Sequence, residues 1–342
     1  MSENRYLKWL SSETPSVYWH DSAIVPELYE ALENGACGLT TNPFLIASTL
    51  KAQPDFWKSV LPGVEAGIQG DLRAEAWTAQ VVAYLANMVR PSRAKGDYCG
   101  YCCAQTNPAR PGDVEATIAA AKKYGACGDN VVIKIPATHA GIEAIEECAA
   151  IGLGVAATVS FTVAQVLAVG EAVQRGHARA KKNGIKPALG IAVLMVGRLD
   201  DYLRDVMQDT RAKATEADII WAGTAAMKRA YRIFRENKYD CILMPAGSRG
   251  GYHITRLAGA KMIMSIAPVI AKALLSETEF ISHIDEEVDS AIIARLMDMP
   301  EFVKAYEPDG MKPEDFITFG SCNRTLDQFV QCGWNTLKGL EL

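Results

Sequence analysis

The sequence predicts a closed parallel (β/α)8 barrel, an α/β TIM barrel with extra N-terminal and C-terminal helices. Short β-rich apolar segments alternate with longer helical patterns along the whole chain, which is the pattern of a parallel sheet. Eight such units follow one another without interruption, and this favours closure into a barrel over an open doubly wound sheet. No Gly-x-Gly-x-x-Gly follows the first strand segment, which argues against a dinucleotide-binding fold.

The strand segments are short and apolar, and helical patterns lie between them. The strand segments are residues 16–21, 37–41, 98–105, 131–135, 155–161, 189–196, 241–246 and 262–266. Apolar residues recur at the i, i+3, i+4 spacing of an amphipathic helix in residues 72–88, 113–124, 141–151, 162–183 and 214–237. Pro26 near a first turn and Gly35 just past the last one bracket a shorter helix.

Two helical regions remain outside the eight units. Residues 5–12 precede the first strand segment, and residues 281–342 follow the last unit. No Ser-, Gly- or Pro-rich linker separates either region from the barrel. We therefore expect both regions to pack on the outside of the barrel, and residues 1–342 to form a single domain.

Composition excludes several classes of protein. The 342 residues include 35 Lys and Arg against 40 Asp and Glu, a net charge of −5, so the broad basic surface of a nucleic-acid-binding protein is absent. Apolar residues make up 49% of the chain, which is enough for a large core. Because no secretory signal and no apolar segment of about 20 residues is present, we expect a soluble cytoplasmic protein without a membrane partner. Assembly into a homo-oligomer is compatible with this composition.

The nine cysteines indicate reduced thiols rather than a disulfide framework, because their number is odd and several lie in apolar strand segments. Cys99, Cys102 and Cys103 form a Cys-x-x-Cys-Cys cluster. A metal or redox site is one interpretation, but no second ligand pair follows at the spacing of a zinc site. We interpret the cluster as buried strand thiols and expect no bound metal.

Lys134 is the first candidate catalytic residue. It interrupts the apolar segment 131–136, and alternation along a strand places it on the same face as Val132, toward the barrel interior. Burial disfavours a charged amine, and a neutral amine is the nucleophile that forms Schiff bases with carbonyl compounds. The alternative is a lysine that reaches from the strand end into solvent.

Polar residues also mark the ends of neighbouring strand segments. Asp21 ends the first segment and Asn42 follows the second. Gln105 ends the third segment and Thr158 lies within the fifth. Active sites of barrel enzymes lie at the carboxyl ends of the strands, so we expect these side chains to form a ring with Lys134.

Several motifs in this region resemble those of the transaldolase family. GLTTNP at residues 38–43 is similar to its Thr-Thr-Asn-Pro motif, and KIPAT at 134–138 is similar to its Schiff-base lysine segment. TVSFTVAQ at 158–165, VGR at 196–198 and AGSR at 246–249 resemble its fifth-, sixth- and seventh-strand segments. The similarity extends over most of the chain, and the motifs occur in the same order as in the family.

The resemblance implies a class I enzyme on a (β/α)8 barrel. Such an enzyme cleaves a ketose phosphate, holds a dihydroxyacetone unit on lysine, and passes it to an aldose phosphate or releases it. Lys134 would form the Schiff base, Asp21 would act as acid and base, and Thr158 would position a water with Gln105. The implied substrate-binding residues are Asn42, Thr41, Arg198, Ser248 and Arg249.

Arg198 and Arg249 would together bind the substrate phosphate, because planar guanidinium groups suit phosphate oxygens. The alternative is that both arginines pair with surface carboxylates. The family uses no metal or organic cofactor, so sugar phosphates are the expected small-molecule partners.

Departures from the family pattern concern the choice of reaction. Transaldolases carry a glutamate where this chain has Gln105, whereas the fructose-6-phosphate aldolase subgroup carries glutamine. That subgroup carries a tyrosine where this chain has Met195, and transaldolases carry a serine at Val193 and an asparagine at Ala156. Three functions therefore stay open: a transaldolase, an aldolase that releases dihydroxyacetone, and a phosphosugar-binding barrel without turnover.

The five histidines show no metal-ligand spacing. Only His20 and His253 lie near predicted strand ends. We interpret His20 as a packed or solvent-facing imidazole, with contact to substrate as the alternative.

Overall fold

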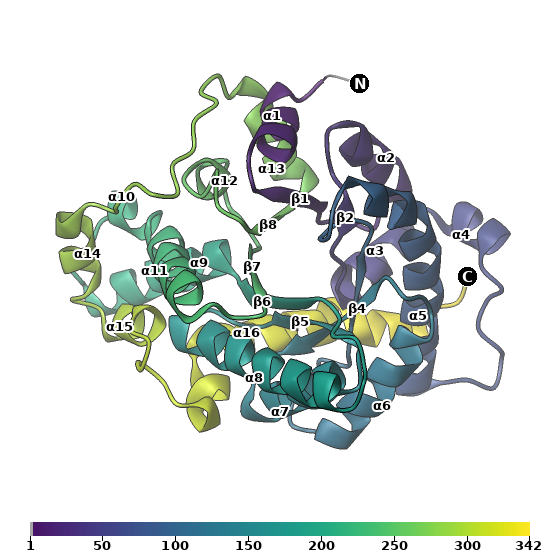
Figure 1. The fold of residues 1–342 in the computed structure, drawn as a ribbon. Helices are drawn as coiled ribbons and strands as arrows, with labels where there is room; N and C mark the ends of the chain where they lie inside the picture. The colour runs from purple at the N-terminus through teal and green to yellow at the C-terminus, as the bar shows by residue number, and fades with distance from the viewer. Residues whose placement is uncertain (1–2) are drawn as a thin grey trace.

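A computed structural model describes residues 3–342 and confirms the predicted (β/α)8 barrel (Figure 1). Each of the eight predicted strand segments overlaps one strand of the sheet within these residues. The strands are β1 Val17–His20, β2 Gly38–Leu39, β3 Cys102–Gln105, β4 Val131–Pro136, β5 Gly154–Thr158, β6 Gly190–Leu194, β7 Ile242–Pro245 and β8 Ile263–Ile266.

The strands pair in parallel in the order β7-β6-β5-β4-β3-β2-β1-β8. Because β1 pairs with both β2 and β8, the sheet curls back on itself and leaves β7 and β8 at the nearly closed seam. Lys134 on β4 is level with Gln105 on β3 and with Ala156 on β5. Side chains at level positions of neighbouring strands point to the same face of a sheet, so this register fixes which residues surround Lys134.

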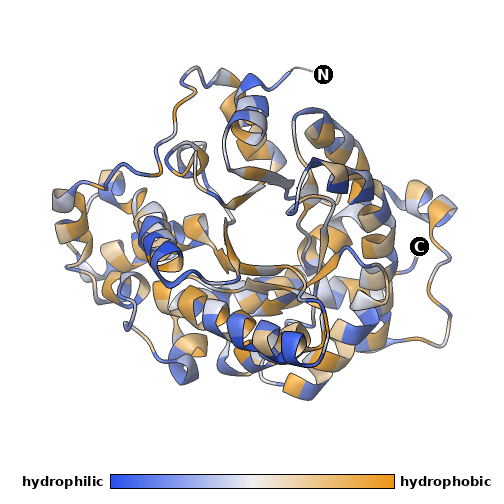
Figure 2. Cartoon of the chain, in the orientation of Figure 1, coloured by the Kyte–Doolittle hydropathy of each residue, from blue (hydrophilic) through white to orange (hydrophobic). Residues whose placement is uncertain are grey.

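Helices surround the barrel, and each strand is followed in the chain by at least one of them. They are α2 Val25–Glu33, α3 Pro43–Ala52, α4 Pro54–Val60, α5 Gly70–Val89, η1 Arg90–Lys95, α6 Val114–Gly125, α7 His139–Ala150, α8 Val163–Lys182, α9 Val196–Thr210, α10 Glu216–Ile219, α11 Ala222–Asn237, α12 Tyr252–Thr255, α13 Pro268–Ala273 and η2 Leu274–Ser276. The predicted helix 214–237 is divided in two, because a capping box between Thr215 and Asp218 begins the short α10. Apolar residues line the strands and the inward helix faces, and polar residues lie outside (Figure 2).

The terminal helices pack on the barrel, as expected. Helix α1 Arg5–Glu13 contacts β1, and its start is capped by the Asn4 side chain, which accepts from Leu7 N. The C-terminal segment contains α14 Ser290–Leu296, α15 Pro300–Tyr306, η3 Pro313–Thr318, α16 Gly320–Phe329, η4 Val330–Trp334 and α17 Asn335–Gly339. Its last part, yellow in Figure 1, runs from α9 to α3 and α5. Within residues 3–342, no helix is long and apolar enough to cross a membrane.

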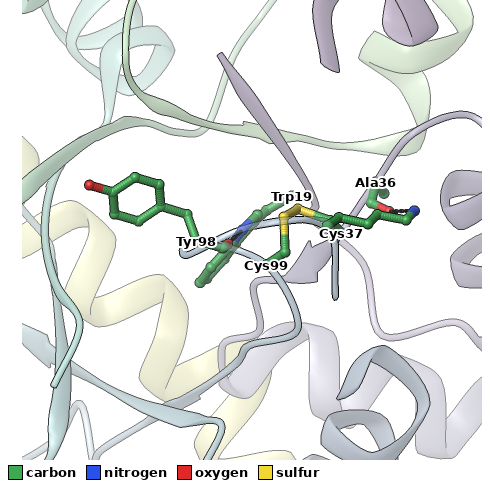
Figure 3. Close-up of a disulfide and its surroundings, with 6 residues drawn as sticks. Trp19, Ala36, Cys37, Tyr98 and Cys99 are labelled. Carbon is green, nitrogen blue, oxygen red and sulfur yellow. Dashed lines mark hydrogen bonds between the residues drawn. A yellow bond between two sulfur atoms is a disulfide. The ribbon is translucent and has the colours of Figure 1, made fainter. Parts of the chain in front are cut away.

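One part of the cysteine prediction is wrong. Cys37 and Cys99 form a disulfide, with their Cα atoms 4.9 Å apart (Figure 3). Cys37 immediately precedes β2 and Cys99 lies just before β3, and Gly100 N donates to Cys37 O at 2.5 Å. The two cysteines are 62 residues apart, so only the pairing of β2 with β3 brings them together.

Cys102 and Cys103 are buried thiols on β3, as predicted. Burial raises the pKa of the Cys103 thiol to about 12. Because the thiolate is the reactive form, this environment keeps Cys103 unreactive at neutral pH.

Gln165 connects the end of β5 to the start of α8. Its buried side chain accepts from Phe161 N at 2.9 Å and donates to Ala137 O at 3.0 Å and to Val159 O at 3.2 Å. Gln165 also completes a capping box with Thr162 at the start of α8. It therefore satisfies backbone groups of the loops that follow both β4 and β5.

We predict that Gln165→Ala lowers the free energy of unfolding by about 2–4 kcal/mol, because several buried backbone groups lose their partners. Urea denaturation measures this change. Gln331→Ala is the matched control, because Gln331 is exposed and its loss should change the free energy of unfolding by less than about 0.5 kcal/mol. Equal effects of the two variants would contradict the role of Gln165.

Candidate functional site

Lys134 lies at the centre of the polar residues at the carboxyl end of the barrel. Its side chain is only 6% exposed. The Nζ atom donates to Thr41 O at 3.3 Å, across from β4 to the end of β2. The terminal group of lysine has three N–H donors, so a single backbone carbonyl leaves donors free for a further partner.

Asp21 directly follows β1 and is held by a hydroxyl. Thr40 Oγ1 donates to Asp21 Oδ1 at 2.6 Å and lies 3.1 Å from Ser265 Oγ on β8. The charges of both Asp21 and Lys134 act on the Cys103 thiol: Lys134 lowers its pKa and Asp21 raises it. Cys103 lies on β3, two residues before Gln105 and therefore on the same face of the strand. The acid and the amine therefore face the same interior space. Thr40 and Ser265 were not predicted as site residues from the sequence, although Thr40 is part of the 38–43 motif.

Thr41 and Asn42 are both engaged in the fold. The Thr41 side chain is fully buried, and its Oγ1 donates to Cys103 O at 2.7 Å. Asn42 caps α3, because its Oδ1 accepts from Leu45 N at 3.0 Å. Thr41 thus faces Lys134 through its carbonyl, and Asn42 retains its amide nitrogen for other partners.

Gln105 and Thr158 present buried polar atoms without partners. Both side chains are at most 1% exposed. Among residues 3–342, neither the Gln105 amide atoms nor Thr158 Oγ1 has a hydrogen-bond partner. Val159, next to Thr158, adopts a φ of 52°, which is unfavourable for a β-branched residue. Unsatisfied buried groups and local strain both occur where a protein binds a ligand or an ordered water.

Arg198 and Arg249 lie together at the mouth of the barrel. Arg198 is in the first turn of α9, and Arg249 is in the loop between β7 and α12. Gly197 allows this approach, because a Cβ at its position would overlap Gly247 O and the Arg249 backbone. Burial lowers the pKa of Arg198, and the positive charge of Arg249 lowers it further. Ser248 precedes Arg249 in the chain, and its Oγ atom is buried and has no partner among the described residues.

The two arginines have different partners. Arg249 Nε lies 2.7 Å from Asp201 Oδ2, so the carboxylate pairing considered from the sequence holds for this residue. Arg198 Nη1 donates to Gln328 Oε1 at 2.6 Å, and its guanidinium lies 5.7 Å from the centre of the Phe329 ring. Because Gln328 is neutral, the charge of Arg198 stays available to an anion. Gln328 belongs to α16, and no pattern in the sequence indicates that the C-terminal segment reaches this site.

His20 points away from the ring of polar residues. It lines a cavity of about 310 Å³ between α1, α2 and α13, together with Glu27 and Lys272. Its side chain is 2% exposed, and neither ring nitrogen has a partner among the described residues. Burial lowers the pKa of His20 to about 4. His20 is therefore a packed neutral imidazole, as its default interpretation from the sequence states.

A larger cavity, of about 680 Å³, lies at the opposite end of the barrel. Its lining includes Tyr98 before β3, Leu189 before β6 and Cys241 before β7. These positions precede their strands, so the cavity opens at the amino end and contains neither Lys134 nor Asp21. The chemistry-bearing residues, rather than cavity size, define the candidate site.

Comparison with known proteins agrees with this geometry. The family described as Transaldolase/Fructose-6-phosphate aldolase matches residues 18–317. A transaldolase of Renibacterium salmoninarum is 30% identical over 215 residues, which are 60% of this chain and 56% of that protein. A transaldolase of Neisseria meningitidis serogroup A is 24% identical over 310 residues, 84% of this chain and 88% of that protein. Transaldolase 2 of Nostoc punctiforme is 22% identical and covers 92% of this chain and 90% of that protein.

We predict that His20 makes stability depend on pH between 6.5 and 4. The folded pKa of about 4 lies below the ordinary value of 6.5, so the unfolded state binds the proton first as the pH falls. The contribution is present above pH 6.5 and decreases by up to about 3 kcal/mol toward pH 4. Urea denaturation of His20→Leu should show a flatter pH dependence than the wild type. His139→Leu removes an exposed imidazole and is the control; equal slopes in His20→Leu and wild type would contradict the prediction.

Proposed function

Because the chain belongs to the transaldolase/fructose-6-phosphate aldolase family, we propose that it transfers a dihydroxyacetone unit between sugar phosphates through a Schiff base on Lys134. The observation that carries this proposal is the buried amine of Lys134, level with Gln105 and close to Asp21 at the carboxyl end of the barrel. Unpartnered polar atoms of Gln105 and Thr158 support it, because a bound substrate and its water would satisfy them.

In the proposed reaction, Lys134 Nζ attacks the C2 carbonyl of the ketose phosphate, and water leaves as the iminium forms. Asp21 removes the proton of the C4 hydroxyl, and the C3–C4 bond breaks. The aldehyde departs, and the bond electrons move into the iminium to give an enamine. The enamine carbon then attacks the carbonyl of an acceptor aldose phosphate, Asp21 returns its proton, and water hydrolyses the new iminium to free Lys134.

The hydrogen bond from Thr40 gives Asp21 a defined orientation for this step. It occupies Oδ1, and among the described residues the second carboxylate oxygen accepts no hydrogen bond. A hydroxyl donor to one oxygen fixes a carboxylate, while the other oxygen stays free to take the substrate proton.

Phosphate binding is proposed for Arg198 and Arg249, together with Ser248. The net charge of −5 gives a dianionic substrate no general attraction, so the local cations at the mouth must supply it. Arg198 has a neutral partner, and the first turn of the 15-residue helix α9 adds backbone N–H groups with a positive dipole end. Charge-assisted hydrogen bonds of this kind contribute roughly 1.5–3 kcal/mol each.

An aldolase that releases free dihydroxyacetone is the second candidate, and Gln105 is the observation that favours it. A glutamine amide can orient a water but cannot share its proton, unlike a glutamate. Proton transfer to the enamine would then depend on Thr158 and the lysine itself. The balance between transfer of the dihydroxyacetone unit and its release would differ from that of an enzyme with glutamate at this position.

We predict that incubation with fructose 6-phosphate and borohydride adds a dihydroxyacetone-derived mass to the peptide containing residues 131–136. Mass spectrometry locates the adduct, because reduction makes the Schiff base permanent. Lys134→Met should abolish both the adduct and turnover, while Lys338→Met, a half-exposed lysine on α17, retains both. Label on another residue, or turnover in Lys134→Met, would contradict the assignment.

Product analysis with fructose 6-phosphate, with and without erythrose 4-phosphate, distinguishes the two candidate functions. A transaldolase forms sedoheptulose 7-phosphate when the acceptor is present, whereas an aldolase releases dihydroxyacetone in both cases. We predict that Gln105→Glu raises the ratio of transfer to release by at least about threefold. Gln331→Glu, on the surface, should leave the ratio unchanged, and an unchanged ratio in Gln105→Glu would remove Gln105 from the specificity argument.

A further inference from the structure

We infer that His253 and Asp200 are positioning residues that fix the backbone of Arg249 and thereby set the preference for phosphorylated sugars. The inference rests on the proposed role of Arg249 in phosphate binding. Both side chains are fully buried, so neither can touch a substrate itself. Their effect must pass through the loop that carries Arg249.

His253 holds the Arg249 backbone directly. Arg249 N donates to His253 Nδ1 at 3.2 Å. A nitrogen that accepts a hydrogen bond carries no proton, so the proton of the neutral imidazole is on Nε2. Nε2 lies 3.0 Å from Asp200 Oδ2, and although this contact lacks the geometry of a hydrogen bond, the negative charge of the carboxylate favours a proton on Nε2, which is the tautomer that Arg249 requires.

Asp200 is itself held by two other elements. Its Oδ1 accepts from Gly223 N at 2.8 Å at the start of α11, and Tyr252 OH donates to its Oδ2 at 3.4 Å. Burial, with the negative charge of Asp200, raises the pKa of Tyr252 to about 12, so its hydroxyl stays a donor. Arg256 covers this network, with its guanidinium 3.5 Å from the centre of the Trp221 ring. The buried carboxylate thus joins α9, α11 and α12.

The loop needs such a constraint because its own sequence supplies little. Gly247, at a φ of 64°, precedes Arg249, and Gly250 and Gly251 follow it. Glycine restricts the backbone less than any other residue, and the Arg249 side chain is 39% exposed. The part-buried hydrogen bond to His253 is therefore the contact that fixes the position of the Arg249 backbone N–H.

The side chain of Arg249 is arranged so that part of it is free. Its Nε lies 2.7 Å from Asp201 Oδ2, and its Nη1 donates to Gly247 O at 3.0 Å. Among the described residues, Nη2 has no partner. Because a displacement of about 1 Å can cost a hundredfold in rate, a shift of the Arg249 backbone would misplace this remaining donor. Adjacent acids thus act differently: Asp201 orients the guanidinium, and Asp200 orients the backbone through His253.

Three variants test the inference. In His253→Asn the amide oxygen can replace Nδ1 as the acceptor for Arg249 N, whereas in His253→Gln the amide lies near Nε2 and that acceptor is lost. Asp200→Asn keeps an oxygen for Gly223 N but turns an NH2 group toward Nε2, which favours the opposite tautomer and places a proton on Nδ1. His253→Gln and Asp200→Asn should therefore behave alike.

We expect both of these variants to raise KM for fructose 6-phosphate, and Ki for inorganic phosphate, by about tenfold. His253→Asn should stay within about threefold of the wild type. The rate at which borohydride traps free dihydroxyacetone on Lys134, which involves no phosphate, should be unchanged in all three. Hydrogen exchange of the peptide containing Arg249 should be faster in His253→Gln than in His253→Asn.

Arg249→Ala distinguishes a failure of the proposed phosphate role of Arg249 from a failure of the positioning role of His253 and Asp200. If it leaves KM for fructose 6-phosphate and Ki for phosphate unchanged, the phosphate role of Arg249 is wrong. If Arg249→Ala raises both constants while His253→Gln and Asp200→Asn match the wild type, only the positioning role is overturned. Equal losses in His253→Asn and His253→Gln, with equal decreases in Tm and slower trapping of dihydroxyacetone, would also overturn it, because such losses indicate a purely structural role.

Discussion

The hydrogen bond from Lys134 Nζ to Thr41 O is the interaction on which the arrangement of the site depends. A buried amine is unfavourable without a polar partner, and here the partner is a backbone carbonyl at the end of β2. The Asp21 carboxylate instead accepts a hydrogen bond from Thr40. Among the described residues, Lys134 and Asp21 therefore form no ion pair with each other. The barrel register then places the unsatisfied Gln105 and Thr158 side chains around the amine.

The site combines a rigid part on strands with an adjustable part on loops. Lys134, Gln105 and Thr158 lie on strands whose positions are fixed by parallel ladders. Arg198 and Arg249 lie on a helix start and a glycine-rich loop, so other groups must fix them. Gln328 from the C-terminal segment and the buried pair of Asp200 and His253 supply those contacts. Reaction chemistry and substrate preference can therefore vary separately in this protein.

The disulfide strengthens a part of the sheet where hydrogen bonding is sparse. Strand β2 contains two residues, and its register with β3 rests on the pair Leu39 and Cys102. Cys37 and Cys99 join the segments that precede these strands, beside the buried Trp19 (Figure 3). This linkage lies at the amino end of the barrel, so it stabilises the strand that leads to Thr40 and Thr41 without entering the site.

The barrel, its eight strands and the inward position of Lys134 can be predicted from the sequence, because strand and helix periodicities are local properties of the chain. The expected ring of Asp21, Gln105 and Thr158 follows from their positions at strand ends. The folded structure is needed to identify the partners of Cys37, Arg198 and Arg249, since each partner lies in a separate element. The roles of His20 and His253 were also decided there: His20 turns toward α1 and α2, whereas His253 turns toward Asp200. Such choices depend on which elements pack together, and no local pattern encodes them.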